Sequence, residues 1–471
     1  MIGIGFNVDY SVMKHFSHLI IGSGQATGVL LGKLIPTGDS IGVIEANKVG
    51  GSCVNYGCTP TKTLVASSKA FHQAKRGDFY GFETGEIKLD YQKVRERMNT
   101  IRNGGSDGLM NWMNNTSNVD LIFGRAKFVG EKQVEANGQI YTADHIYINV
   151  GTRPSAPPIQ GINDINWLDS ARLLDLEKIP EHLIVIGGGY IGVEFAQVFR
   201  RFGARVSIIQ RSNQLMPRED KDVADAIRDF LEEEGIDIFC SANTTKVSQK
   251  SDYKEVEIDI EGETKVLRGD EVLVAAGRIP NSDTLALENT RIETDSRGYI
   301  EVDKYCETAV QGVYAVGDVN GKGAFTHTAV NDAEIVLDKL FEGDRTLDTR
   351  NIVYGLFTDP PLGRVGMTEK EALKSGKKVL KATRPMRMIS RAKEMGETKG
   401  FAKLLVDAET DLILGASILG VGGDEIINMF ATIMHSNIPC RHYRKVVLVH
   451  PTVSELMPWI LDGIKEAKEN S

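Results

Sequence analysis

Apolar runs that end in glycine turns organise the first part of the chain. Residues 18–21 (HLII) and 41–45 (IGVIE) are predicted to be short buried strands, with a glycine turn at residues 22–28 (GSGQATG) and a helical stretch between them. The second strand ends in Glu45, which lies 45 − 24 = 21 residues beyond Gly24. Glycines placed in this way let the backbone approach a pyrophosphate at a helix N-terminus, and the acid binds a ribose hydroxyl. The pattern predicts a dinucleotide-binding unit, with Thr27 in the place of the third glycine.

The same order of elements returns in the middle of the chain. Strands are predicted at residues 183–186 and 205–209, and residues 187–192 between them read GGGYIG, a full G-x-G-x-x-G motif. The residue that matches Glu45 is Gln210, at 210 − 189 = 21. The turns at residues 151–154 (GTRP) and 277–280 (GRIP) close the two segments in a similar way. The sequence therefore predicts two dinucleotide-binding units, with domain boundaries at these turns.

The pattern changes in the last third of the chain. Residues 312–318 (GVYAVGD) predict an apolar strand that ends in Gly-Asp, and a helix is expected to begin near Thr326. From about Asn351, strands such as residues 401–406 alternate with helices, which predicts a separate α+β domain. This domain contains His450 in the run HPTVSE, after an apolar stretch at residues 446–449 that is interpreted as a strand. A lone histidine in such a strand is more often a core residue than a catalyst.

Two cysteines stand close together near the first glycine turn. Residues 50–62 (GGSCVNYGCTPTK) place Cys53 and Cys58 with four residues between them and Lys62 one helical turn later. In a regular α-helix, five steps of about 1.5 Å would put the cysteine Cα atoms beyond the roughly 7 Å that a disulfide spans. A bridge here therefore needs a distorted helix start, which the glycines and Pro60 permit.

Three interpretations of this cysteine pair compete. A zinc site is disfavoured because the three other cysteines, Cys240, Cys306 and Cys440, are scattered singles. A structural disulfide is rarely stable in a reducing cytosol. A redox-active dithiol is somewhat favoured, since the nearby cation Lys62 stabilises the reactive thiolate.

Composition excludes several classes of protein. The 471 residues are 41% hydrophobic and 25% charged, as in an ordinary soluble protein of about three domains. The net charge of −9 and the lack of a basic patch argue against a nucleic-acid partner. No apolar run is long enough to span a membrane, and residues 1–16, interpreted as an N-terminal extension, lack the apolar core of a signal peptide. We expect a cytoplasmic protein.

Taken in order, these motifs resemble the class I pyridine nucleotide-disulfide oxidoreductases, the family of dihydrolipoamide dehydrogenase, glutathione reductase and mercuric reductase. The resemblance covers nearly the whole chain after residue 16. It implies an α/β fold of two dinucleotide-binding (Rossmann-like) domains, for FAD and NAD(P), and a C-terminal α+β dimerisation domain. The implied bounds are residues 1–16 for the extension, 17–152 for the FAD domain, 153–280 for the NAD(P) domain, 281–349 for a central part that completes the FAD domain, and 350–471 for the dimerisation domain.

The resemblance also implies which residues bind the cofactors. For FAD they are Gly22, Gly24, Glu45, Gly51, Ser52, Lys62, Ala126, Gly151, Asp318 and Thr326. For NAD(P) they are Gly187, Gly189, Gly192, Gln210, Arg211, Ala276 and Gly277. NAD enzymes usually carry an acid at the position of Gln210, and Arg211, with Arg205 and Arg218 nearby, would suit a 2′-phosphate. NADPH is therefore favoured, although Gln210 is also compatible with either nucleotide.

Catalytic roles follow from the same resemblance. Cys58 is expected to be the thiol next to the flavin and Cys53 the thiol that exchanges with the substrate. Lys62 is expected to lie near the reactive flavin nitrogen, paired with Glu194. His450, oriented by Glu455, would handle protons in the active site of the other subunit, which implies a homodimer. No metal site is expected.

The identity of the electron acceptor stays open at this point. The chain ends without the C-terminal cysteine pair of mercuric reductases, although residues 210–212 (QRS) resemble that branch. The His–Glu pair fits dihydrolipoamide dehydrogenase, so the leading hypothesis is an enzyme of that kind acting on a small-molecule disulfide. The alternatives are a flavoprotein reductase of quinones or metal ions, and a redox-sensing flavoprotein.

Overall fold

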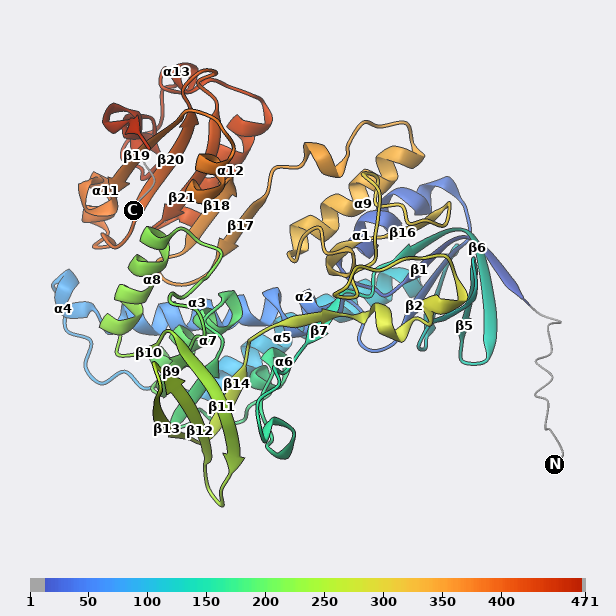
Figure 1. The fold of residues 1–471 in the computed structure, drawn as a ribbon, viewed down its shortest axis with the longest axis horizontal. Helices are drawn as coiled ribbons and strands as arrows, with labels where there is room; N and C mark the ends of the chain where they lie inside the picture. The colour runs from blue at the N-terminus through green and yellow to red at the C-terminus, as the bar shows by residue number, and fades with distance from the viewer. Residues whose placement is uncertain (1–12, 468–471) are drawn as a thin grey trace. The chain divides into compact units, whose positions relative to one another are not determined.

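Strands far apart in the sequence pair to build the sheets of this fold. In the computed structural model, which describes residues 13–467, the chain divides into two units (Figure 1). The first comprises the described residues up to 61 together with 95–155 and 278–350. The second comprises 62–94, 156–277 and the described residues from 351. Each unit therefore collects three separate stretches of the chain.

A parallel sheet forms the first unit. Its strands run in the order β3-β2-β1-β6, with β16 paired to β6 and the hairpin strands β5 and β4 continuing beyond β6. Strand β1 begins at Lys14, so the sheet includes residues that we predicted to belong to the extension 1–16, because Phe16 is buried in the core. Residues 1–12 of that extension lie outside the described part. The bounds are β1 Lys14–Ile21, β2 Ile41–Glu45, β3 Val119–Phe123, β4 Lys127–Gly130, β5 Gln133–Ala136, β6 Gln139–Ile148 and β16 Val313–Ala315.

Two helices cover one face of this sheet. Helices α1 (Gln25–Leu34) and α9 (Thr326–Leu340) pack on one another, and Figure 1 shows them together beside β16. Ile20, Leu30, Tyr147 and Val336 are fully buried between these helices and the strands. The helix start predicted near Thr326 is therefore where α9 begins. The other helices with residues in this unit are α2 (Gly51–Tyr56), α3 (Cys58–Ala74) and α5 (Tyr91–Asn114).

The two glycine-proline turns of the sequence pair with one another. Strand β7 (Thr152–Pro154) and strand β15 (Arg278–Pro280) form an antiparallel ribbon in which Arg278 faces Pro154. The Arg278 guanidinium donates to the Thr152 hydroxyl at 2.8 Å. The chain thus leaves the first unit and returns to it through adjacent strands.

A second parallel sheet lies in the other unit. Its order is β10-β9-β8-β14, and an antiparallel sheet of β11, β12 and β13 lies between β10 and β14 in the chain. Helix α7 (Tyr190–Phe202) follows β8 and packs on β8 and β9. The remaining bounds are α4 Gly77–Tyr80, α6 Ser170–Leu174, α8 Lys221–Glu233, β8 His182–Ile186, β9 Arg205–Ile209, β10 Asp237–Phe239, β11 Ala242–Gln249, β12 Lys254–Ile260, β13 Glu263–Gly269 and β14 Glu271–Val274.

The C-terminal part of the second unit contains an antiparallel sheet of order β17-β18-β21-β20-β19-β22. Helix α12 (Gly423–His435) packs on β18 and β21, as Figure 1 shows. The predicted strand at residues 446–449 is wrong: this stretch is irregular and exposed, with Val447 95% accessible. The other bounds are β17 Val353–Leu356, β18 Leu362–Gly366, α10 Glu369–Lys374, β19 Val379–Pro385, α11 Ser390–Glu394, β20 Phe401–Asp407, β21 Ile413–Leu419, α13 Cys440–Tyr443 and β22 Lys465–Glu466.

Within residues 13–467, no helix is both long and apolar enough to cross a membrane. The cytoplasmic location expected from the sequence stays a prediction.

Candidate active site

The cysteine pair lies where one helix is broken into two. Helix α2 ends at Gly57, whose backbone is not helical, and Cys58 begins α3. Gly51 has φ of +62°, and a Cβ added there would lie 2.8 Å from the Cα of Gly24. Across this break the Cys53 and Cys58 thiols are hydrogen-bonded to one another, and glycine is needed at residue 51 for this segment to approach the first glycine turn.

The two thiols differ in their surroundings. The Cys58 sulfur is exposed and lies 3.2 Å from the hydroxyl of Thr326, the first residue of α9. The N-terminus of this helix favours negative charge. A hydrogen bond with Cys58, followed by burial, raises the pKa of the Cys53 thiol far above its ordinary value. Cys53 therefore holds its proton tightly, and a base is needed to turn it into a nucleophile.

Lys62 stands one turn after Cys58 on helix α3 and is paired with a buried acid. Its ammonium lies 2.6 Å from Glu194 on α7, and Glu194 is only 5% exposed. The other carboxylate oxygen of Glu194 accepts a hydrogen bond from the Phe357 backbone at 2.9 Å. Both oxygens of this acid thus have partners, and its carboxylate is held in one place.

His450 also carries a carboxylate partner. Its Nδ1 lies 2.9 Å from each oxygen of Glu455. The histidine side chain is 76% exposed, whereas that of Glu455 is 12% exposed. Nδ1–H donated to Glu455 leaves Nε2 to accept a proton from the solvent side, which is the arrangement of an oriented general base. A shallow cavity of about 260 Å³ beside the pair is lined by residues 446–448, Glu455 and Trp459, among others.

The first glycine turn presents a site for an anion. Gly22 has φ of +93°, and a Cβ there would collide with the Asn149 carbonyl. Gly24 caps α1 without any side-chain cap bond or acid in the first turn, among the residues that the structure describes. Glu45 accepts hydrogen bonds from the Ser23 backbone at 2.8 Å and from the Asn47 backbone at 2.7 Å. The open helix end suits a pyrophosphate and the buried acid suits ribose hydroxyls.

Thr27 has a structural use in this turn. Its hydroxyl donates to the Gly22 carbonyl at 3.0 Å and accepts from the Asn149 amide at 3.0 Å. The residue that replaces the third glycine therefore ties the turn to the end of β6. Asn149 and this role of Thr27 were missed from the sequence, where the only signal was the departure from the motif.

The remaining residues predicted to bind FAD lie in the same unit, apart from Lys62. Asp318 follows β16 and accepts a hydrogen bond from the Thr152 hydroxyl at 2.9 Å. Gly151, with φ of +62°, precedes Thr152, and Ala126 is buried between β3 and β4. Ser52 is exposed on α2. An uncapped helix end, a buried acid and Asp318 within one unit fit the phosphates and hydroxyls of FAD.

The second glycine turn has the same arrangement as the first, but Gln210 takes the place of Glu45. Gly187 has φ of +112°, and a Cβ there would lie 2.5 Å from the Ala275 carbonyl oxygen. Gly189 caps α7, and Gly192 is packed too closely against the Gly187 carbonyl for any side chain. The Gln210 side-chain oxygen accepts from the Gly188 backbone at 2.8 Å, and its amide donates to Ser212.

The three arginines near Gln210 in sequence are not equivalent in space. Arg211 and Arg218 are exposed, and neither forms an ion pair with a residue in the described range. Arg205 lies at the opposite end of β9 and pairs with Asp237 at 3.0 Å, so its inclusion with the phosphate-binding arginines was wrong. Ala276 and Gly277 follow β14, and a Cβ at Gly277 would meet open space.

Comparisons with known proteins decide the family. The model described as "Pyridine nucleotide-disulphide oxidoreductase" matches residues 16–333, and that of its dimerisation domain matches residues 352–461. The chain belongs to the pyridine nucleotide-disulphide oxidoreductases.

Relatives of this oxidoreductase include enzymes of several names. It is 36% identical to "Probable pyridine nucleotide-disulfide oxidoreductase RclA" of Escherichia coli (strain K12), over 96% of this chain and 100% of the relative. It is 34% identical to "Mercuric reductase" of Lysinibacillus sphaericus, over 89% and 77%. It is 31% identical to "Dihydrolipoyl dehydrogenase" of Geobacillus stearothermophilus, over 93% and 94%.

Solved structures agree in fold. The HOCl-induced flavoprotein disulfide reductase RclA from Escherichia coli superposes with a TM-score of 0.84 at 35% identity, covering 95% of this chain and 98% of that one. Its Cu(II) complex gives 0.86 at 34% identity, covering 96% and 99%. The predicted α/β fold with a dimerisation domain is confirmed. Members of this family use FAD and NAD(P)H, and the matched dimerisation domain supports a homodimer.

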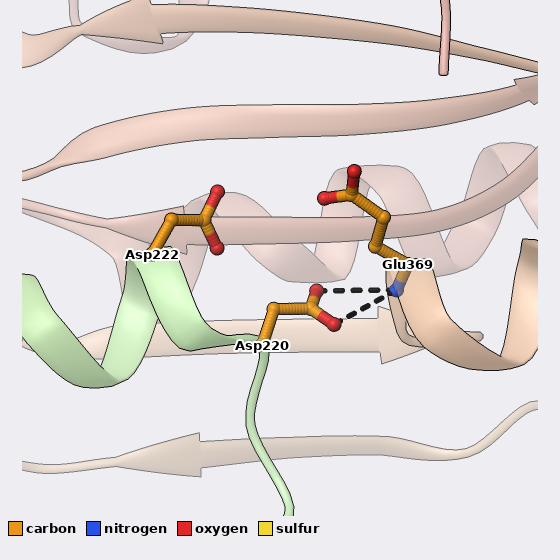
Figure 2. A group of neighbouring side chains, drawn as sticks. All are labelled: Asp220, Asp222 and Glu369. Carbon is orange, nitrogen blue, oxygen red and sulfur yellow. Dashed lines mark hydrogen bonds between the residues drawn. The ribbon is translucent and has the colours of Figure 1, made fainter. Parts of the chain in front are cut away.

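One acidic group of the oxidoreductase has the geometry of a metal site. Oxygens of Asp220, Asp222 and Glu369 all lie within 4.8 Å of one another, and Figure 2 shows Asp220 accepting from the Glu369 backbone. The ammonium of Lys403, 1% exposed, lies 2.8 Å from Asp220, 2.7 Å from Asp222 and 3.3 Å from Glu369. This lysine occupies the position of a cation, so the group is a buried ion network that joins β20 to the start of α8.

Proposed function

We propose that this protein is an NADPH-dependent flavoprotein reductase whose Cys53–Cys58 pair passes electrons to a small disulfide. The observation that carries the proposal is the broken helix, which places Cys58 against the first turn of α9 and leaves Cys53 as the thiol that keeps its proton. FAD, when bound to the first unit, would take a hydride from the nicotinamide and return the electron pair to the cysteine disulfide.

The dithiol then reduces the substrate. Cys53, deprotonated by His450, attacks one sulfur of the substrate disulfide, and the leaving thiolate takes that proton from His450. Cys58 attacks the resulting mixed disulfide, which restores the Cys53–Cys58 bridge. The second substrate thiolate is released and takes a proton from the medium. One NADPH and one proton are consumed for each disulfide reduced to two thiols. The exposed Nε2 of His450 and its carboxylate partner support this role.

We further propose that each active site takes His450 and Glu455 from the partner subunit. The support is the exposed position of His450, with Glu455 held beside it, in the domain that matches the dimerisation family. Glu455 would serve to hold the imidazole, and Lys62 with Glu194 would stabilise negative charge on the reduced flavin.

Turnover of a panel of disulfides with NADPH and with NADH tests this function. The panel should contain oxidised lipoamide, glutathione disulfide and cystine, since dihydrolipoyl dehydrogenase-like use is one branch of the proposal. We expect the wild type to reduce at least one of these disulfides rapidly. The rate of that turnover should fall at least about a hundredfold in His450→Gln. If no disulfide is turned over with either nucleotide, the substrate class is wrong.

The reduction of metal ions is a second candidate. It is favoured by two relatives, one named mercuric reductase and one solved as a Cu(II) complex, and by the exposed thiol of Cys58. The reduction of a metal ion has no thiolate leaving group that must be protonated. Cu(II) reduction should therefore persist in His450→Gln. Equal loss of disulfide and Cu(II) reduction in that variant would contradict the role given to His450.

The division of roles between the thiols has its own test. Cys53→Ser should leave a Cys58 thiolate that gives a long-wavelength charge-transfer band with oxidised flavin, while Cys58→Ser should not. A band in the second variant but not in the first would mean that the two roles are exchanged.

A further inference from the structure

Residues 357–359, which follow strand β17, are held by one face of helix α7. The helix contributes Glu194, Gln197 and Arg201, which are spaced by three and four residues and so line one face. Glu194 accepts from the Phe357 backbone N–H at 2.9 Å. Gln197 accepts from the Asp359 N–H at 2.8 Å and donates to the Asp359 carbonyl at 2.9 Å.

The side chain of Asp359 completes this attachment. It pairs with Arg201 at 2.8 Å and with Lys69 of helix α3 at 3.0 Å, and it is 8% exposed. Burial opposes the charge of this carboxyl, but Arg201 and Lys69 together hold its pKa below the ordinary value. Backbone hydrogen bonds and ion pairs therefore hold this short segment in place relative to α7 and α3.

Helix α3 meets the same segment with a second lysine. Lys62 and Lys69 are two turns apart and lie on one side of the helix. The Lys62 ammonium lies 4.6 Å from the centre of the Phe357 ring, within the range of a cation–π contact. The Lys62 side chain is 32% exposed, so this cation–π contact is partly accessible to solvent.

Lys62, Glu194 and Phe357 each contact the other two. Glu194 binds the Lys62 ammonium through one oxygen and the Phe357 backbone through the other, and the aromatic ring of Phe357 contacts that same ammonium. A lysine has a flexible four-carbon stem, and a single carboxylate would leave its ammonium free to swing around that one bond. A second anchor on an independently fixed backbone removes this freedom.

We propose that Phe357 is a positioning residue that holds the Lys62 ammonium for its work at the flavin. The inference rests on the proposed function, which assigns Lys62 to the reduced flavin. The aromatic face, and not only the volume of the side chain, supplies the second anchor. Lys69, Gln197 and Arg201 act one step further back by fixing the segment from which the ring projects.

Two measurements on the purified holoenzyme test the proposal with Phe357→Leu and Phe357→Met. The first is the labelling rate of the Lys62 amine by an amine-reactive ester, followed by peptide mass spectrometry. Loss of the ring should raise this rate about fivefold, because a partly exposed cation–π contact corresponds to an equilibrium preference of that order. Phe357→Tyr keeps an aromatic face and should keep the wild-type labelling rate. Phe79→Leu, which removes the ring from a cation–π contact with Arg76, is the matched control.

The second measurement is the midpoint potential of the bound flavin. A less firmly held ammonium stabilises the reduced flavin less, so the potential should fall by about 14–30 mV, which corresponds to a threefold to tenfold shift in the two-electron equilibrium. Phe357→Leu and Phe357→Met should behave alike and Phe357→Tyr should not. Wild-type labelling and potential in both aliphatic variants would overturn the proposal, as would a full effect in Phe357→Tyr.

Lys62→Met separates this proposal from the function on which it rests. If Lys62→Met leaves the flavin potential unchanged, Lys62 does not act at the flavin and the proposed role fails. If Lys62→Met lowers the potential but the Phe357 variants do not, only the positioning role of Phe357 fails. If an aliphatic variant does not fold, the other one and the labelling of Lys62 in Phe357→Tyr still decide the outcome.

Discussion

In both dinucleotide units a side-chain oxygen from the second strand accepts a hydrogen bond from the backbone of the glycine turn, but the two side chains differ in charge. In the first, the last residue of β2 is Glu45, which accepts from the Ser23 backbone next to Gly22. In the second, the residue after β9 is Gln210, which accepts from the Gly188 backbone next to Gly187. Both side chains pin a glycine turn to the neighbouring strand, but only one of them carries a charge.

The difference shows that attaching a glycine turn to the neighbouring strand does not require a charged side chain. A neutral amide is sufficient to hold the second turn, so a carboxylate there is not needed for the fold. Under the proposed function, the amide changes the electrostatic field around the ribose of the nicotinamide nucleotide. Gln210 does not repel a phosphate there, and the exposed cations Arg211 and Arg218 are close to it in sequence. The first turn keeps its charge, which suits the ribose of FAD and excludes a phosphate.

Glu45→Gln should give the largest effect, because it makes the first unit resemble the second. Loss of charge-assisted hydrogen bonds from the Ser23 backbone and hydroxyl, and from the Asn47 backbone, should weaken FAD retention by about 10- to 100-fold. The measurement is the FAD dissociation constant from fluorescence titration of the stripped protein. Glu131→Gln, which removes an exposed acid paired with Arg291, is the control and should retain FAD normally.

Gln210→Glu is the converse change and should give the next largest effect. A carboxylate beside the 2′-phosphate should lower the ratio of kcat/KM for NADPH to that for NADH by about tenfold, from repulsion of like charges. Arg205→Gln is the matched control, because Arg205 lies at the far end of β9 with Asp237. An unchanged ratio in Gln210→Glu, or an equal change in Arg205→Gln, would show that this end of the strand does not select the nucleotide.

Arg211→Ala and Arg218→Ala should each have a smaller effect. Both side chains are exposed, so each should raise the KM for NADPH by only about threefold and leave that for NADH unchanged. The increase should shrink as salt is added, since exposed charges are screened over roughly 10 Å at 0.1 M. A loss that is the same for both nucleotides would place the arginines outside the phosphate site.

The smallest effect concerns histidines in the two parallel sheets. His18 and His145 stack at 5.4 Å in the first unit, and burial lowers the pKa of each below 6.5, with His145 adding to the effect on His18. A lowered pKa means that the unfolded state binds more protons, so stability is complete above pH 6.5 and falls as pH drops through 6.5, by at most about 1.4 kcal/mol per pH unit for each proton.

Hydrogen exchange resolves this effect unit by unit. After correction for the intrinsic rate, peptides of β1 and β6 should lose protection between pH 7 and pH 5.5, and His145→Phe should reduce that loss while keeping a stacked ring. In the second unit burial also lowers the pKa of His182, but its ring nitrogens lie 2.6 Å from the Arg268 carbonyl and 2.9 Å from the Ser207 hydroxyl. The loss in β8 should therefore not respond to His145→Phe.

Much of the framework could be predicted from local patterns. The strands at 41–45 and 205–209 and the start of α9 at Thr326 were predicted at their observed bounds, because apolar runs and glycine turns are local signals. The motif order also led to the family. The resemblance further suggested the pairing of Lys62 with Glu194, which the structure places in contact although the residues are far apart in sequence.

Other features depend on contacts that sequence spacing cannot show. Arg205 is near Gln210 in sequence, but Arg205 begins strand β9 and Gln210 follows its last residue, so the two side chains lie at opposite ends of the strand. The apolar stretch at 446–449 has the pattern of a buried strand, but Val446, Val447 and Val449 are exposed in the described chain, because a run of apolar residues does not by itself show what they pack against. Phe357 carries no motif, and its relation to Lys62 exists only because β17 ends beside α7.

The ribbon formed by β7 and β15 has a consequence for how such a protein is assembled from parts. Because the chain enters and leaves through neighbouring strands, residues 155–277 are a cassette whose two ends already meet. Lengthening, shortening or exchanging the cassette costs little in loop closure, since the base of the loop is fixed by the strands themselves. An exchanged insert would leave the sequences of the flavin turn and the dithiol unchanged, but it would have to keep the face of α7 that binds Lys62, Phe357 and Asp359.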